Sequence, residues 1–136
     1  MTSGTYTYRV LIVEDHLETR TYLRMALSDT LDVSEVANAV DALNAIDAQD
    51  FDLLLIDIAL GSRMTGKELL THLRQTPPYD EVPIVAMTAH HHRDNREEYL
   101  RHGFDAYLAK PFFPEELHRI LARLLGDDTD QDQPSP

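Results

Sequence analysis

Charged and hydroxyl side chains stand at the ends of four short apolar runs in this sequence. Glu14 and Asp15 come directly after one run, and Asp57 ends another. Thr88 ends a third run, and Lys110 follows the fourth. Clustered carboxylates repel one another unless they are protonated or bridged by a cation. If these residues meet in the folded chain, they form an acidic site that also offers one hydroxyl and one ammonium group.

An oxygen-only site with few protein ligands, and with room for water and a phosphate, suits Mg²⁺ or Mn²⁺. The Lys110 ammonium can bind one phosphoryl oxygen, and the Thr88 hydroxyl can donate a hydrogen bond to another. In phosphoryl transfer, positioning and charge neutralisation supply most of the rate. The residue types therefore predict a phosphoryl-transfer site.

The segments that must position these residues alternate between two hydrophobic periods. Short apolar runs indicate strands, and apolar residues spaced at i, i+3 and i+4 indicate helices. The run 53–56 is apolar throughout, as expected of a central strand covered on both faces. Strands are predicted at 9–13, 33–37, 53–56, 84–88 and 106–109, and helices at 17–28, 39–46, 66–75, 93–101 and 114–125.

Strands that alternate with helices through short loops predict an α/β fold, in which helices cover both faces of a parallel sheet. Right-handed crossovers between parallel strands then leave few topologies. In such sheets, ligands bind outside the carboxyl ends of the strands, where the strand order reverses. All the chemical residues follow carboxyl ends, so we expect them to converge on one edge of the sheet.

The composition is that of a globular domain with a large negative charge. The chain has 136 residues, with 12 Lys and Arg against 24 Asp and Glu, for a net charge of −12. A field of this sign repels nucleic acid, so no direct nucleic-acid binding is expected. Cysteine is absent, which fits a cytoplasmic protein. Without a long apolar run or a signal-peptide core, we expect neither membrane insertion nor export.

Residues 9–126 are predicted to form one domain, preceded by an N-terminal extension at 1–8. The stretch 127–136 is rich in aspartate, so we expect a solvated, disordered acidic tail. We expect no DNA-binding or catalytic domain after Gly126. The chain is predicted to be either a stand-alone domain or a part of a longer protein divided at its acidic linker.

The motifs around these residues resemble those of the response-regulator receiver domains of two-component signalling. The similar segments are residues 10–15, 53–57, 87–89 and 110–112. They occur in the family's order and at its usual separations, and the resemblance extends over roughly residues 8–125. It implies a doubly wound, CheY-like or flavodoxin-like sheet of five parallel strands in the order 2-1-3-4-5, with five helices.

The resemblance also implies that Asp57 is the phosphoacceptor, which takes a phosphoryl group from a histidine kinase or a histidine phosphotransfer protein and becomes an acyl phosphate. Asp15 and Asp57 are then ligands of Mg²⁺ or Mn²⁺, Glu14 helps to hold the metal, and the backbone carbonyl of Ala59 is a further ligand. The chain is thus expected to be a signalling phosphoacceptor, which catalyses only its own phosphorylation and dephosphorylation, rather than an enzyme with a separate substrate.

Further residues match the part of the family that responds to phosphorylation. Thr88 and Lys110 are expected to contact the phosphoryl group, and Thr88 and Tyr107 are expected to move together as a switch. The Lys110–Pro111 peptide bond is predicted to be cis, a form that is readily accessible only before proline. The surface of the fourth helix, fifth strand and fifth helix is the expected contact for a downstream protein, an output domain or a second copy in a homodimer.

Other interpretations differ in what they require of the same positions. A flavin protein of this architecture needs a phosphate cradle after the first strand, where Glu14 and Asp15 place negative charge instead. A metal-dependent phosphatase with an aspartate nucleophile carries Asp-x-Asp, and Ala59 stands where the second acid would be. A docking module that works without phosphorylation stays open, because Leu60-Gly61 stands where the family often has Met-Pro or Leu-Pro three and four residues after the nucleophile.

Two further features of the sequence bear on these expectations. Gly66, which opens the third helix, lies one residue further from Asp57 than is commonest in the family, so the loop 59–65 is predicted to be longer than average. His90, His91 and His92 are adjacent in a predicted loop, where neighbouring side chains are expected to point in different directions, so a plain loop is expected rather than a metal site.

Overall fold

Strands and helices alternate along the chain in the computed structural model, which describes residues 8–60, 64–89 and 93–126, with only the backbone described at 93–96. The described residues form five strands and five helices. Their bounds are β1 Arg9–Val13, α1 Leu17–Leu27, β2 Asp32–Val36, α2 Ala39–Ala48, β3 Leu53–Asp57, α3 Gly66–Arg74, β4 Ile84–Thr88, α4 Arg93–His102, β5 Ala106–Ala109 and α5 Pro114–Leu125.

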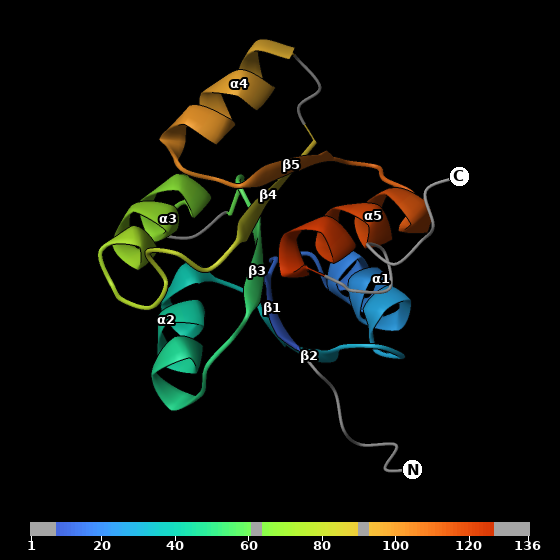
Figure 1. Cartoon of the computed structure of the whole chain (residues 1–136), viewed down its shortest axis with the longest axis horizontal. Helices are drawn as coiled ribbons and strands as arrows, with labels where there is room; N and C mark the ends of the chain where they lie inside the picture. The colour runs from blue at the N-terminus through green and yellow to red at the C-terminus, as the bar shows by residue number, and fades with distance from the viewer. Residues whose placement is uncertain (1–7, 61–63, 90–92, 127–136) are drawn as a thin grey trace.

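The strands form one parallel sheet in the order β2-β1-β3-β4-β5, which confirms the predicted topology. In the register of the sheet, Val13 lies beside Ile56, and Asp57 lies beside Met87. The carboxyl ends of the central strands are therefore level with one another. Figure 1 shows α1 and α5 on one face of the sheet and α2 and α3 on the other, so the strand order reverses at β1 and β3.

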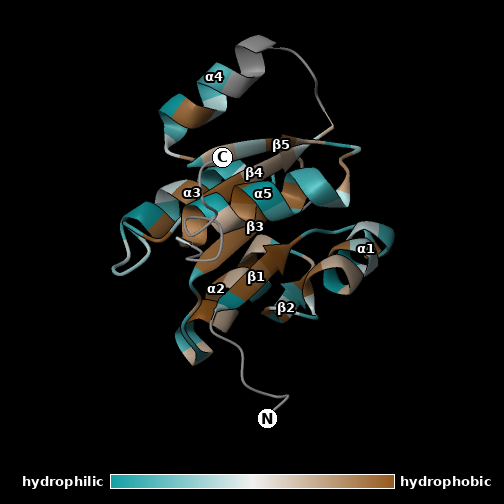
Figure 2. Cartoon of the chain, turned by 45° about the vertical axis from the view of Figure 1, so that its right-hand side comes forward, coloured by the Kyte–Doolittle hydropathy of each residue, from teal (hydrophilic) through white to brown (hydrophobic). Residues whose placement is uncertain are grey.

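The core has two layers, because successive side chains of a strand point to opposite faces of the sheet. On β3, Leu54 and Ile56 pack toward α2, α3 and α4, whereas Leu53 and Leu55 pack toward α1 and α5. Every residue of β3 is buried, and the strands stand out as the most hydrophobic part of Figure 2. The buried strands therefore fix the edge of the sheet at which the polar residues emerge.

Local signals explain where two of the helices begin. The Asn38 side chain accepts a hydrogen bond from the Asp41 backbone N–H at 2.8 Å, which caps α2. Thr65 and Glu68 form a reciprocal capping box at the start of α3. Strand β2 lies one residue earlier than predicted, because its register with β1 places Asp32 beside Arg9.

The ends of the chain were also part of the sequence-based expectations. The predicted extension at 1–8, apart from Tyr8, and the predicted tail at 127–136 lie outside the described residues. Within the described ranges, no helix combines the length and apolar character that crossing a bilayer requires.

Candidate functional site

The polar residues that follow the strands meet at the carboxyl edge of the sheet, next to the reversal of strand order. The Lys110 ammonium contacts Glu14 Oε1 at 2.6 Å and Asp57 Oδ2 at 3.4 Å. The backbone N–H of Lys110 donates to the carbonyl of Thr88 at 2.7 Å. The carboxyl ends of four strands, β1, β3, β4 and β5, are thereby joined in one site.

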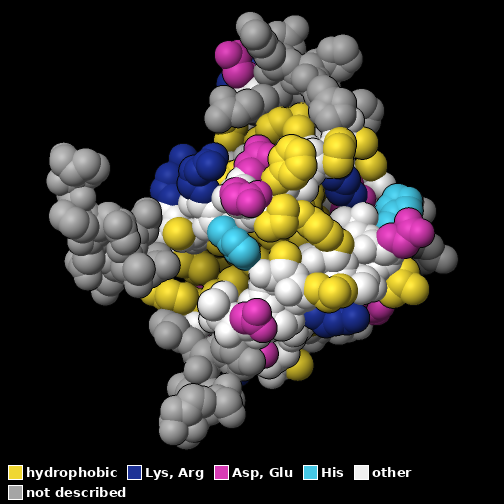
Figure 3. Space-filling model, turned by 90° about the vertical axis from the view of Figure 1, so that its right-hand side faces the viewer, with side chains coloured by type: hydrophobic (Ala, Val, Ile, Leu, Met, Phe, Trp, Pro, Cys, Tyr) yellow, Lys and Arg dark blue, Asp and Glu magenta, His cyan; other side chains and the backbone are white. Residues whose placement is uncertain are grey.

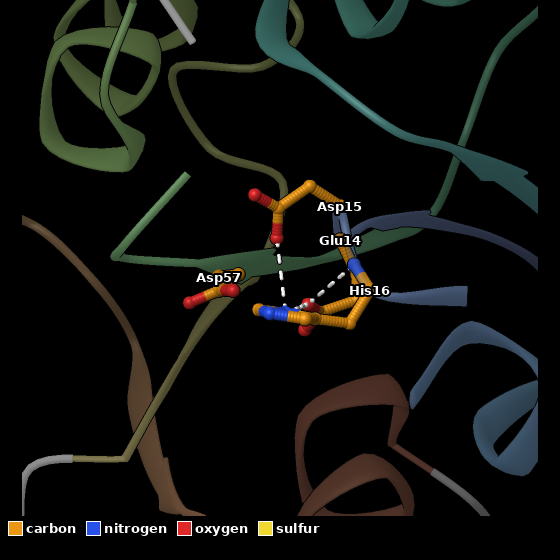
Figure 4. Close-up of side chains that lie close together, drawn as sticks. All are labelled: Glu14, Asp15, His16 and Asp57. Carbon is orange, nitrogen blue, oxygen red and sulfur yellow. Dashed lines mark hydrogen bonds and ion pairs between the residues drawn. The ribbon is translucent and has the colours of Figure 1, made fainter. Parts of the chain in front are cut away.

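The acidic part of this site consists of Glu14, Asp15 and Asp57, with His16 added to them. Each of the four residues offers a ligand atom, and these atoms lie within 4.8 Å of one another. Figure 4 shows the imidazole of His16 beside the Glu14 and Asp15 carboxylates, with Asp57 on the neighbouring strand. The Glu14 side chain is fully buried, whereas those of Asp15 and His16 are 32% and 70% exposed, so the cluster opens to solvent on one side.

Glu14 is a carboxylate held by hydrogen bonds inside the protein. Burial by itself raises the pKa of Glu14, but hydrogen bonds from Lys110 and His16 outweigh it, and the pKa is lowered overall. One carboxylate oxygen accepts from Lys110, and the other accepts from the backbone N–H of His16 at 3.1 Å. Glu14 therefore remains ionised and forms the buried anionic base of the site.

The pKa of Asp57, unlike that of Glu14, is raised overall. Burial raises the pKa of Asp57, and the charge of Glu14 adds to this effect, while a hydrogen bond from the Ala59 backbone N–H and the charge of Lys110 oppose it. The Ala59 N–H donates to Asp57 Oδ1 at 2.9 Å. Asp57 is thus a nearly buried carboxylate whose negative charge the protein alone compensates poorly.

His16 was not among the predicted site residues. Its ring nitrogen Nδ1 lies 3.0 Å from Glu14 Oε2 and 3.1 Å from Asp15 Oδ1. The hydrogen bond with Glu14, followed by the charge of Asp15, raises the pKa of this histidine. The signal in the sequence was the position of His16 directly after Glu14 and Asp15. As the residue that precedes α1, it lies in a turn that brings its ring back beside the two carboxylates.

The comparisons with known proteins agree with this geometry. The family model of the response regulator receiver domain matches residues 10–122. The chain belongs to this family. The receiver match begins at Val10 in β1 and includes the other four strands in full and most of α5. The site at the sheet edge is therefore that of a receiver domain of two-component signalling.

Relatives of this receiver differ in their total length. An uncharacterised 14.6 kDa protein of Leptolyngbya boryana is 37% identical, and the match covers 82% of this chain and 86% of that protein. The cyclic di-GMP phosphodiesterase response regulator RpfG of Xanthomonas campestris is 33% identical, and the match covers 85% of this chain but 31% of RpfG. The chain thus corresponds to nearly the whole of one relative and to less than a third of the other.

A solved structure gives a similar comparison for the fold. The receiver domain of the sensor histidine kinase PA1611 from Pseudomonas aeruginosa, which has a magnesium ion coordinated in its active-site cleft, is 33% identical to this chain. The two superpose with a TM-score of 0.80, and the match covers 88% of this chain and 98% of the other. The match therefore extends over nearly the whole of that receiver domain.

The remaining predicted residues of the receiver lie around the acidic cluster rather than in it. Thr88 is fully buried at the end of β4. Tyr107 is half-buried on β5, and its ring stacks on that of Tyr99 with the centroids 5.7 Å apart and the planes at 24°. The Lys110–Pro111 peptide bond is cis. The roles assigned to these residues, and to the carbonyl of Ala59, stay predictions.

Two predicted features fall on parts of the chain that the structure does not describe. Residues 61–63 of the loop after Asp57 lie outside the described ranges, and so do His90, His91 and His92. The expectations of a lengthened loop and of a plain histidine loop therefore stay predictions.

An open depression of about 560 Å³ lies beside Lys110, between α1 and the segment that follows β5. Exposed hydrophobic residues belong to the same region, with Leu17 64% exposed at the start of α1 and Phe113 74% exposed before α5. Figure 3 shows hydrophobic side chains gathered on the face that carries α1 and α5. The depression is lined by Glu18, Thr19, Tyr22, Ala89, Lys110, Pro111 and Phe112.

Gly66 brings the start of α3 against the backbone of the site. A Cβ atom at this position would lie 2.6 Å from the carbonyl oxygen of Asp57 and 2.9 Å from the Cα of Ile58. Both neighbours are backbone atoms, so neither can yield by a change of side-chain rotamer. The close approach explains why glycine opens this helix, although its φ is not positive.

We expect Gly66→Ala to lower the free energy of unfolding by about 1–3 kcal/mol, as overpacking of a tight contact does. Because the clash is with Asp57, the substitution should also slow phosphorylation of the remaining folded protein. Urea unfolding followed by circular dichroism measures the first effect. Thr71→Ala, at an exposed position of the same helix, should unfold close to the wild type, and equal losses in both variants would contradict the assignment.

Proposed function

We propose that this receiver accepts a phosphoryl group on Asp57 from a phosphohistidine of a partner protein, with Mg²⁺ bound in the acidic cluster. The observation that carries the proposal is the position of Asp57. Its carboxylate is 4% exposed, lies 3.4 Å from the Lys110 ammonium and belongs to a group of acids that opens to solvent. This is the arrangement that a carboxylate nucleophile and an incoming phosphoryl group require.

The donors fit a hard divalent cation, which prefers oxygen ligands. Both oxygens of Glu14 already accept hydrogen bonds from protein groups. As the family resemblance implies, Asp15 and Asp57 would bind Mg²⁺ directly, the fully buried Glu14 would help to hold it, and the carbonyl of Ala59 is the proposed third ligand. When bound, the metal supplies positive charge that relieves carboxylate repulsion and neutralises phosphoryl oxygens.

In the proposed reaction, an Asp57 carboxylate oxygen attacks phosphorus as the P–N bond to the donor histidine breaks. The freed imidazole takes up a proton, and the new P–O bond makes Asp57 an acyl phosphate. Lys110 can bind an oxygen of the phosphoryl group once it is attached to Asp57, because its ammonium already contacts both Glu14 and Asp57. The Thr88 hydroxyl is proposed to donate to a phosphoryl oxygen, and water later hydrolyses the acyl phosphate.

The partners follow from the same family. Receiver domains act with histidine kinases and with output domains, and we propose a kinase or a phosphotransfer protein as the donor for this chain. Thr88 and Tyr107 are proposed to shift together after phosphorylation and to bias the surface of α4, β5 and α5 between two populations. A downstream protein, an output domain or a second copy of the chain would bind that surface.

The proposal is tested by intact mass spectrometry after incubation with acetyl phosphate and Mg²⁺. The wild type should gain the mass of one phosphoryl group, and Asp57→Asn should gain none. A sample with the metal chelated should also gain none. Because the acyl phosphate hydrolyses, several short time points are needed before the absence of a mass shift is accepted.

The control for specificity is Asp47→Asn, which removes an exposed carboxylate at the end of α2 that leads into the start of β3, whereas the site lies at the carboxyl end of β3. It should be phosphorylated as the wild type is. If a folded wild-type protein gains no phosphoryl group at any time point, the chain is instead a docking module that works without phosphorylation. A phosphoryl group that persists on Asp57→Asn would show that the acceptor is another residue.

A further inference from the structure

Arg20 on α1 reaches back to the turn that carries the acids. Its guanidinium Nη1 donates to the backbone carbonyl oxygen of Glu14 at 2.8 Å, and its Nε donates to Glu35 Oε1 on β2 at 3.1 Å. The side chains of Arg20 and Glu35 are only 17% and 20% exposed. Water therefore competes weakly for these charge-assisted hydrogen bonds.

The carbonyl that Arg20 binds belongs to the peptide unit between Glu14 and Asp15. A peptide unit is planar, so a hydrogen bond that fixes its carbonyl also fixes the direction of the N–H of the next residue. The other side of Glu14 is fixed as well, because its backbone N–H donates to the carbonyl of Val36 at 3.0 Å. The orientation in which Asp15 leaves β1 thus depends on Arg20.

We propose that Arg20 is a positioning residue for the metal site, which acts by holding the Glu14–Asp15 peptide so that the Asp15 carboxylate faces Asp57. The inference rests on the proposed function, because it assigns Asp15 and Asp57 as the metal ligands. Glu35 contributes to this positioning, because its carboxylate on β2, the strand beside β1, holds the guanidinium of Arg20. A partner that orients a metal ligand commonly affects metal affinity about 10–100-fold.

Arg24 offers a matched comparison within the same network. It lies one turn further along α1 and its Nη1 binds Glu35 Oε2, the second oxygen of the same carboxylate. Among the described residues, the side-chain hydrogen bonds of Arg24 stop at Glu35, whereas those of Arg20 continue to the backbone of the site. Replacing either arginine removes one positive charge from α1, but only the replacement of Arg20 releases the Glu14 carbonyl.

Charge and positioning predict opposite changes in metal affinity. Arg20 places a positive charge near a cation site, so by electrostatics alone its removal should strengthen the binding of Mg²⁺. If Arg20 aims Asp15, its removal should weaken binding despite the loss of that charge. The sign of the change in the Mg²⁺ dissociation constant therefore separates the two effects.

The experiment is a calorimetric Mg²⁺ titration of the wild type and of Arg20→Met, Arg20→Lys, Glu35→Gln and Arg24→Met, each shown to be folded by circular dichroism. We expect Arg20→Met to raise the dissociation constant by about 10-fold or more. Arg20→Lys, which keeps the charge but lacks the second donor group of the fork, should give a smaller rise. Glu35→Gln should also raise it, and Arg24→Met should stay close to the wild type.

The outcomes separate this inference from the proposed function. If the wild type binds Mg²⁺ and is phosphorylated, but Arg20→Met binds the metal as tightly as Arg24→Met does, the positioning role is wrong while the phosphoacceptor role stands. Tighter binding by Arg20→Met would show that Arg20 acts only through its charge. If the wild type itself neither binds Mg²⁺ nor gains a phosphoryl group, the proposed function fails. Should Arg20→Met not fold, the comparison of Arg20→Lys with Arg24→Met decides the matter in the same way.

Discussion

Replacing Lys110 with methionine should lower the free energy of unfolding of the metal-free receiver by about 3–5 kcal/mol, the cost of removing one partner from a buried ion pair. Glu14 is fully buried, and its shortest charged contact is the 2.6 Å hydrogen bond from the Lys110 ammonium. Methionine retains much of the side-chain length but none of the charge. Glu14 would then be left as an uncompensated buried carboxylate beside Asp57, or would have to take up a proton to fold.

The loss is measured by urea unfolding in the presence of a chelator. Lys67→Met is the matched control, because Lys67 is a lysine 38% exposed whose ion pair with Glu98 spans 3.4 Å. Removal of such an exposed pair should cost no more than about 1 kcal/mol. Lys110→Met should also fail to gain a phosphoryl group from acetyl phosphate. A loss in Lys110→Met no larger than that in Lys67→Met would show that Glu14 does not depend on the lysine.

Much of the fold could be predicted because it follows from local patterns. The apolar run at 53–56 marks a strand buried on both faces, and β3 occupies the centre of the sheet. The convergence of Glu14, Asp57 and Lys110 was predictable from a rule about parallel sheets, without any distance. The family resemblance then supplied the strand order, which the alternation of elements alone did not determine.

What escaped prediction depends on side-chain paths that no local pattern encodes. Arg74 donates to the carbonyls of Tyr79, Val82 and Gly103 and to the carboxylate of Asp105, and so fastens α3 to the turn before β5. In the sequence it is merely a basic residue at the end of a helix. Such contacts join residues that are close only after folding, and many alternatives would fit the same sequence.

In the site too, the sequence predicts which residue types come together but not which contacts they make. The Lys110 ammonium contacts both carboxylates, but it lies closer to Glu14 than to Asp57, at 2.6 Å against 3.4 Å. The hydrogen bond from Lys110 is the largest of the contacts that lower the pKa of the buried Glu14 carboxylate. Sequence motifs identify which groups meet, but they do not determine which of the two carboxylates the lysine contacts more closely.

Replacing Asp57 with asparagine should raise the melting temperature of the metal-free receiver by several degrees, and should remove most of the further rise that Mg²⁺ gives to the wild type. Burial and the charge of Glu14 both raise the pKa of Asp57, so its ionised form is less stable in the folded protein than in the unfolded chain. Asparagine has nearly the same shape without the charge. It therefore relieves the repulsion permanently, whereas in the wild type the metal relieves it only when bound.

Thermal melts of both proteins with a chelator and with excess Mg²⁺ give the four temperatures needed. A ligand that binds only the folded state at 100 times its dissociation constant stabilises by about 2.7 kcal/mol, which sets the scale of the wild-type response. Asp47→Asn, which removes an exposed acid of α2, should match the wild type in both conditions.

The higher melting temperature and the lost response to Mg²⁺ should appear together, because both have one cause. The ionised Asp57 carboxylate destabilises the folded protein when no cation is bound beside it. If Asp57→Asn instead melts lower than the wild type without metal, the Lys110 contact would outweigh the repulsion from Glu14, and the site would be neutral enough to need no metal. If Asp57→Asn is stabilised but still responds fully to Mg²⁺, the metal would bind elsewhere than between Asp15 and Asp57. Only a rise in stability coupled to a lost metal response fits a nucleophile held in an acidic, metal-dependent site.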